Sequence, residues 1–137
     1  MIVATADSNI YVSAFLTDGV ARQFLNAARS GAFQLAISEP IIAEVRGVLW
    51  NKFQWSEDRL DEAVSALREF TQLVIPTKTL RIVMEDPDDD RIIECAIASH
   101  SQFIVSGDKD LLRLAQFQTV RILKLSEFMR LIPDPTV

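Results

Sequence analysis

Carboxylates gather at two places in this chain of 137 residues, on either side of a helix-like and a strand-like segment. The first group is the run EDPDDD at residues 85–90, and the second is Asp108 and Asp110 in the loop SGDKD. Two carboxylates about 4 Å apart repel by about 4 kcal/mol at an effective dielectric near 20, so a fold that unites such groups must protonate some or bind a cation. Oxygen ligands without histidine or cysteine favour Mg²⁺ or Mn²⁺. The stretch therefore predicts half of a divalent-metal site.

Two further acids stand where a strand or a helix can aim them at the same place. Asp7 directly follows the apolar run IVATA, where burial is costly unless a cation or a hydrogen-bond donor faces the carboxylate. The alternative for Asp7 is an N-cap of the following turn. Glu44 falls roughly 40° beyond the apolar stripe of its predicted helix, at about 100° per residue. It is either a ligand that reaches past the stripe or an ordinary boundary glutamate.

The elements that must position these acids alternate along the chain. Short apolar, β-branched runs predict strands, and amphipathic runs between them predict helices. The strands are expected at 2–6, 34–37, 73–75, 103–105 and 120–123, and the helices at 20–29, 39–49, 56–73, 91–100, 111–115 and 127–131, with Ser38, Ser56 and Ser126 as caps. This alternation predicts an α/β three-layer sandwich with a central, mostly parallel sheet of four to five strands flanked by helices. The strand ends would then gather Asp7, Asp90 and Asp108 at one edge, with Glu44 on a neighbouring helix.

The composition fits one globular domain over residues 1–137, with 131–137 as a tail. Nothing near Met1 looks like a signal peptide, and no apolar run approaches the roughly 18 residues that span a membrane. The single Cys95 is expected in the core of a protein from a reducing compartment, which favours the cytoplasm. The net charge of −5 argues against a protein that merely coats nucleic acid. The aromatic segment 50–55 (WNKFQW) is expected to join two helices, as core or as a contact surface.

Several other chemistries are excluded. The single histidine, His100, suits a solvated or helix-end position rather than a Ser-His-Asp triad, and one histidine with one cysteine supplies no zinc cluster. The 1-3-5 spacing of Asp86, Asp88 and Asp90 suggests an EF-hand calcium loop, but Arg91 and Ile97 occupy positions that need glycine and glutamate. No phosphate-binding loop of the G-x-x-x-x-G-K-[ST] type is present.

Four pieces together resemble a PIN domain: DSN after the first strand, Glu44 in SEPIIAEV, DPDDDRIIECA, and IVSGDKDLL. The resemblance is strongest to the single-domain toxins of toxin–antitoxin pairs (VapC-like), and it covers nearly the whole chain. It implies a Mg²⁺- or Mn²⁺-dependent endoribonuclease that leaves a 3′-hydroxyl and a 5′-phosphate. It assigns the site to Asp7, Glu44, Asp90 and Asp108, with Asp110 as an auxiliary metal ligand and Ser8, Asn9 and Ser106 as polar neighbours. Asp90 is chosen over Asp88 and Asp89 because it stands three residues before Ile93 in the family's D-x-x-[IL] pattern.

The resemblance also implies partners: an RNA substrate, a small antitoxin protein and a second copy of the chain in a homodimer, with no membrane. Arg91, Lys109 and Arg113 are candidate contacts to the RNA backbone. Two rival hypotheses stay open. One is a Mg²⁺-binding receiver-like domain, for which Lys109 beside Asp108 is a poor match, and the other is a catalytically inactive PIN scaffold that acts by binding proteins.

Overall fold

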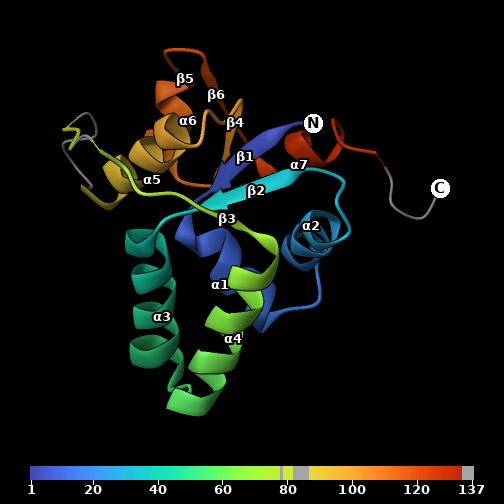
Figure 1. Ribbon diagram of the computed structural model, residues 1–137, viewed down its shortest axis with the longest axis vertical. Coiled ribbons are helices and arrows are strands. Elements are labelled where there is room, and N and C mark those ends of the chain that lie inside the picture. Colours follow the sequence, from blue (N-terminus) through green and yellow to red (C-terminus); the bar gives the residue numbers. More distant parts are fainter. Residues whose placement is uncertain (78, 82–86, 134–137) are drawn as a thin grey trace.

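The computed structural model describes residues 1–77, 79–81 and 87–133, and six strands of this part of the chain form one sheet (Figure 1). They are β1 (Val3–Ala6), β2 (Gln34–Ile37), β3 (Gln72–Leu73), β4 (Phe103–Val105), β5 (Gln116–Phe117) and β6 (Val120–Leu123). Their order is β3-β2-β1-β4-β6-β5, and every neighbouring pair is parallel except β5–β6. The predicted mostly parallel sheet is therefore confirmed, with the two-residue β5 as an addition at its edge.

Seven helices surround this sheet in the described ranges (Figure 1). They are α1 (Ser8–Leu16), α2 (Val20–Arg29), α3 (Glu39–Phe53), α4 (Glu57–Phe70), α5 (Pro87–Ala98), α6 (Lys109–Leu114) and α7 (Leu125–Met129). Helix α5 packs on β1, β2 and β4, whereas α2 packs against α1 and α7. Helices α3 and α4 form a hairpin that extends away from the sheet (Figure 1).

The chain reverses the direction in which it adds strands next to β1. From β1 it proceeds outward to β2 and β3, and then it returns to place β4 on the other side of β1. Right-handed crossovers consequently put α1–α4 and α5–α6 on opposite faces of the sheet. At such a reversal the connections leave neighbouring strand ends in opposite directions, which opens a crevice at their carboxyl edge. Asp7 and Ser106 follow the two strands concerned, β1 and β4.

The strands are apolar because both of their faces are covered. In β1 and β4, Ala4, Ala6, Ile104 and Val105 are completely buried. Across the sheet, the rings of Phe24, Phe33 and Phe128 tie α2, the start of β2 and α7 together, with ring centroids 4.9–5.5 Å apart. This packing closes the core at the start of β2.

Several boundaries differ from those predicted. Helix α1 was not predicted, because its sequence SNIYVSAFL is apolar on most sides and lies between α2 and α3. Helix α3 runs on to Phe53, so the expected connector at 50–55 is mostly helical. Helix α5 begins at Pro87 rather than at 91, which puts Asp88, Asp89 and Asp90 inside its first turn.

Caps were predicted with mixed success. The Ser56 side chain caps α4 by accepting from Arg59 N at 3.2 Å, as expected. Ser38 stands at the N-cap of α3 but makes no capping hydrogen bond with its side chain. The expected Ser126 cap is wrong, because α7 starts at Leu125 after Lys124. The predicted roles of Glu85 and Asp86 lie outside the described residues, and none of the described helices is long and apolar enough to cross a membrane.

Candidate metal centre

Asp7 sits at the point where β1 becomes α1, and it is 5% exposed. Its backbone N–H donates to Val105 O at 3.1 Å, which extends the β1–β4 pairing by one residue. Its side chain caps α1, with Oδ1 accepting from Ile10 N at 3.2 Å. The N-cap that the sequence offered as the alternative for Asp7 is thus present, and the carboxylate is buried directly after a strand.

Ser106 links Asp7 to the loop that follows β4. This residue is completely buried, and its backbone N–H donates to Leu123 O of β6 at 3.0 Å. Its hydroxyl donates a short hydrogen bond to Asp7 Oδ2 and accepts one from Asp108 N at 2.9 Å. One hydroxyl therefore fixes the relative positions of the strand-end acids Asp7 and Asp108.

Asp108 caps helix α6, which begins one residue later. Its Oδ1 accepts from Asp110 N at 2.9 Å and from Leu111 N at 3.1 Å. This cap turns the next acid, Asp110, back towards the sheet edge, where Asp110 Oδ1 also accepts from Arg113 at 3.3 Å. The SGDKD loop thus presents two carboxylates from one tight turn.

Three carboxylates converge at this edge. One oxygen each from Asp89, Asp108 and Asp110 lies within 4.8 Å of the others. Asp89 belongs to the first turn of α5, and the other two belong to the loop and first turn of α6. At about 4–5 Å and an effective dielectric near 20, each pair of ionised groups repels by about 3–4 kcal/mol. Oxygen donors at this spacing, without histidine or sulphur, fit a hard divalent cation such as Mg²⁺ or Mn²⁺.

The pKa of Asp7 is shifted by its surroundings at the same site. Burial raises the pKa of its carboxyl above the ordinary value, and the charge of Asp108 raises that pKa further. Hydrogen bonds from Ser106 and from the backbone of Ile10 and Asn9 act in the opposite direction. A buried carboxylate next to another one is stabilised in its ionised form by a nearby cation.

The predicted site residues do not all fall in one group. Glu44 is half-buried on α3, and Asp90 is buried in α5, but neither belongs to the three-carboxylate cluster. Ser8 is buried in the first turn of α1, and Asn9 beside it is exposed. The D-x-x-[IL] pattern selects Asp90, whereas the structure brings Asp89 to Asp108 and Asp110. A signal for Asp89 was present, since it stands one helical turn before the buried Ile93.

An open depression of about 620 Å³ lies over the site. Its lining includes Asp7, Asn9, Asp108, Lys109, Asp110 and Arg113. Lys109 and Arg113, two of the three basic residues predicted to contact the RNA backbone, thus lie beside the acids. The third, Arg91, directs its guanidinium to the carbonyl of Leu80 at 3.0 Å and to Glu94 at 2.8 Å.

Tyr11 is a buried neighbour that the sequence did not single out. It is completely buried on α1, and within the described residues its hydroxyl has no hydrogen-bond partner. Burial first, and then the charges of Cys95 and Asp7, raise the pKa of this phenol well above its ordinary value. Only its place in an apolar helix could have indicated its burial, because nothing in its spacing connects it to the acids.

Comparison with known proteins supports the same family. The family model described as "PIN domain" matches residues 4–110. The structure resembles the crystal structure of VapBC2 from Rickettsia felis, bound to a DNA fragment from its promoter, with a TM-score of 0.64 and 16% identity over 90% of this chain and 98% of that one. The T. brucei RRP44 PIN domain aligns at a TM-score of 0.49 with 16% identity, over 94% of this chain and 79% of that one. A search of curated protein sequences finds no match.

The family match covers β1, the helices before the acid run, and both acid-bearing loops. The VapBC2 likeness shows the same fold over nearly the whole length of both chains. These two findings argue against the receiver-like alternative. The chain belongs to the PIN domain family, whose members are generally nucleases.

Proposed function

We propose that this PIN domain is an endoribonuclease that hydrolyses RNA phosphodiesters with the help of Mg²⁺ or Mn²⁺. The observation that carries the proposal is the convergence of Asp89, Asp108 and Asp110 within 4.8 Å, at the edge where Asp7 ends β1. Asp7, Glu44, Asp90, Asp108 and Asp110 remain the site residues that the family pattern selects, and Asp89 joins them.

Each group has a separate task in this proposal. Asp89, Asp108 and Asp110 would hold divalent ions, which would supply an activated water and stabilise the leaving oxygen of a phosphodiester. Ser106 would keep the carboxylate of Asp7 in place beside them. Lys109 and Arg113, which line the same depression, contact phosphates of the RNA backbone. A 3′-hydroxyl and a 5′-phosphate are the expected product ends.

The proposed biological role is that of the toxin in a toxin–antitoxin pair in the cytoplasm. The likeness to the VapBC2 structure, in which the fold occurs together with an antitoxin, supports this role. The expected partners are a small antitoxin protein and a second copy of this chain.

Cleavage of a mixed single-stranded RNA in the presence of Mn²⁺ tests the activity. We expect cleavage that EDTA stops and added Mn²⁺ restores. Asp108→Asn should lower the rate of RNA cleavage at least about 100-fold, because it removes a charged carboxylate oxygen that no neighbouring side chain replaces. Asp89→Asn and Asp90→Asn, measured side by side, identify which acid of α5 holds the metal.

Asp58→Asn is the matched control, since this exposed acid lies in the first turn of α4 and not at the sheet edge. It should cleave like the wild type. Cleavage that persists in EDTA, or that survives Asp108→Asn, would contradict the proposal. A wild-type protein that binds an antitoxin but neither Mn²⁺ nor RNA would instead support the inactive scaffold.

A further inference from the structure

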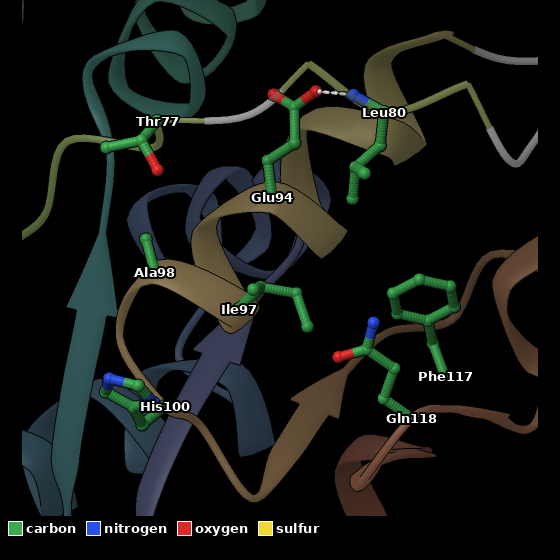
Figure 2. Close-up of a pocket in the computed structure, with 8 residues that line it drawn as sticks. All are labelled: Thr77, Leu80, Glu94, Ile97, Ala98, His100, Phe117 and Gln118. Atoms are coloured by element: carbon green, nitrogen blue, oxygen red, sulfur yellow. Dashed lines mark hydrogen bonds between the residues drawn. The ribbon is translucent and has the colours of Figure 1, made fainter.

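A partly buried ion pair on α5 is bonded to the backbone of Leu80, which precedes the acidic turn in the sequence. Glu94 is 8% exposed, and its Oε2 accepts from Leu80 N at 2.7 Å (Figure 2). The same oxygen pairs with Arg91 at 2.8 Å. Arg91 in turn donates to Leu80 O at 3.0 Å. The N–H and the C=O of one residue are therefore both engaged by charged side chains of the same helix. We call Arg91, Glu94 and the Leu80 backbone the clamp.

The clamp closes a loop that contains the acidic run. Leu80 and Glu94 lie 14 positions apart in the sequence, and Asp88, Asp89 and Asp90 stand between them. Closing a loop removes conformations in which its ends separate. Charge-assisted hydrogen bonds such as these are roughly twice as strong as neutral ones, and the burial of Glu94 limits competition from water. The clamp thus holds Leu80 and α5 together.

The acidic first turn of α5 needs such restraint because its carboxylates are repelled by those of the neighbouring loop. Asp89 lies near Asp108 and Asp110, and without a cation their mutual repulsion pushes the start of α5 away from the sheet. The later turns of α5 are held by Ile92, Ile93, Cys95 and Ala96 in the core, but these residues all follow the acids. The clamp adds a polar link between this helix and Leu80, which lies before the acids in the sequence.

Glu94 also controls where the charge of Arg91 acts. Arg91 directly follows Asp90, so a guanidinium that lost Glu94 would stand beside the acidic run. It would then compete with a divalent cation for the same carboxylates. Loss of Glu94 therefore weakens metal binding in two ways, by loosening the turn and by freeing a competitor.

We propose that Glu94 is a positioning residue for the metal centre, acting through Arg91 and the Leu80 backbone on the acidic first turn of α5. This inference rests on the proposed metal-dependent function. It predicts that Glu94 sets the affinity for the cation and not the chemistry of the loaded site.

Calorimetric titration of Mn²⁺ into the wild type and Glu94→Gln tests the proposal. Glutamine keeps the size of the side chain and an acceptor for Leu80 N, but it loses the charge that holds Arg91. We expect the dissociation constant for Mn²⁺ to rise about tenfold, at the lower end of the effect of outer groups on metal sites. Each titration is done at a temperature well below the midpoint of thermal unfolding of that variant. The Mn²⁺ concentration for half-maximal RNA cleavage should rise in parallel, while the rate at saturating Mn²⁺ recovers.

Glu39→Gln is the matched control, because it removes the same charge from an ion pair of the same kind. Glu39 and Arg68 make two contacts of 2.7 and 3.0 Å, but their side chains are half-exposed on α3 and α4. This variant should bind Mn²⁺ like the wild type. The double variant Glu94→Gln, Arg91→Gln removes the competitor as well, and it should regain part of the lost affinity.

The outcomes separate this inference from the proposed function. A wild type that binds Mn²⁺ and a folded Glu94→Gln that binds it equally well would overturn the role of Glu94 alone. A wild type without Mn²⁺ binding would overturn both. A lower melting temperature with an unchanged dissociation constant would show that the clamp only stabilises the fold, which also contradicts the proposal.

Discussion

The hydroxyl of Ser106 holds two acids with one oxygen, as donor to Asp7 and acceptor from the backbone of Asp108. A threonine can replace it without loss of either bond, whereas an alanine removes both. The sequence predicted Asp7 and Asp108 as neighbours because each follows a strand that ends at the same edge, and the family resemblance added Ser106 beside them. It could not decide between Asp89 and Asp90, because the choice depends on where α5 begins and how far it rotates.

Replacing Ser106 tests this link. Ser106→Ala should lower kcat/KM for Mn²⁺-dependent RNA cleavage by about 10- to 100-fold, the usual effect of a group that orients a metal ligand. Ser106→Thr should stay close to the wild type, because its hydroxyl can make both bonds. Steady-state cleavage rates decide the matter, and equal rates for the alanine and threonine variants would count against the link.

The raised pKa of Asp7 predicts a pH dependence of stability in the absence of metal. A carboxyl with a raised pKa in the folded state contributes stability that is fully present below its ordinary value of 3.8 and is lost as pH rises through the folded pKa. Asp7→Asn lacks this loss and keeps a capping side chain. Thermal unfolding in EDTA should therefore give the variant a higher midpoint than the wild type at pH 7, with the two converging towards pH 4. Added Mn²⁺ should stabilise only the wild type, and a constant difference across this range would refute the assignment.

Cys95 is expected to be inert in the folded protein. Burial raises the pKa of its thiol to about 11, although the side chains of Thr5 and Ser38 act in the opposite direction. At pH 8 only about one thiol in a thousand would be ionised, and the thiolate is the reactive form. A disulphide reagent at pH 8 should react slowly with the native protein and at once in guanidinium chloride. Fast labelling of the native protein would show that the thiol is accessible.

Among the elements, the end of α3 is the boundary that the sequence pattern predicted least well. The segment WNKFQW looks like a connector because it interrupts the apolar stripe, yet α3 continues to Phe53 and ends with Gln54 in a left-handed conformation at φ 52°. The backbone N–H of Trp55 then bonds to Leu49 O at 3.1 Å, which folds the chain back. The two tryptophans consequently have opposite environments, since Trp50 is 52% exposed and Trp55 is buried. The expectation of an aromatic contact surface thus narrows to Trp50 and Phe53.

Alanine at each tryptophan should separate these environments. Trp55 packs edge-on against Phe15 at 6.0 Å and lies under the Arg59 guanidinium at 3.9 Å. Trp55→Ala should lower the free energy of unfolding by about 3–5 kcal/mol, as for other buried aromatic residues. Trp50→Ala should change it by less than about 0.5 kcal/mol. Urea denaturation measures both, and a large loss at Trp50 would indicate that a second copy or another contact covers it.

The whole molecule is acidic, with a net charge of −5, although its proposed substrate is a polyanion. The long-range field therefore opposes binding, and attraction must come from bound cations and from the few basic side chains beside the site. The fold class followed from the sequence because short apolar runs, which predict buried strands, alternate with amphipathic runs of helical period. The short β5 and the apolar α1 could not be predicted from the sequence, since their positions depend on contacts with distant segments.

This balance of charge predicts a weak dependence of RNA binding on monovalent salt. Two phosphate contacts, from Lys109 and Arg113, give a slope of about −1.4 in a plot of log affinity against log salt for a single strand. Lys109→Ala should reduce the magnitude of the slope by about 0.7 and weaken binding of all sequences alike. Fluorescence anisotropy with a labelled RNA and the inactive Asp108→Asn protein measures it. A slope that Lys109→Ala leaves unchanged would remove this lysine from the interface.

Because Asp7 lies beside the carboxylate cluster and also caps α1, the helix still needs a cap when the proposed chemistry is lost. Asparagine, serine and threonine satisfy that need without a charge, whereas alanine or leucine would leave the first turn of α1 unsupported. Relatives of this chain that have lost hydrolytic activity but still fold should therefore have one of those three residues at this position. The residue found there would then distinguish inactive but stable relatives from destabilised ones.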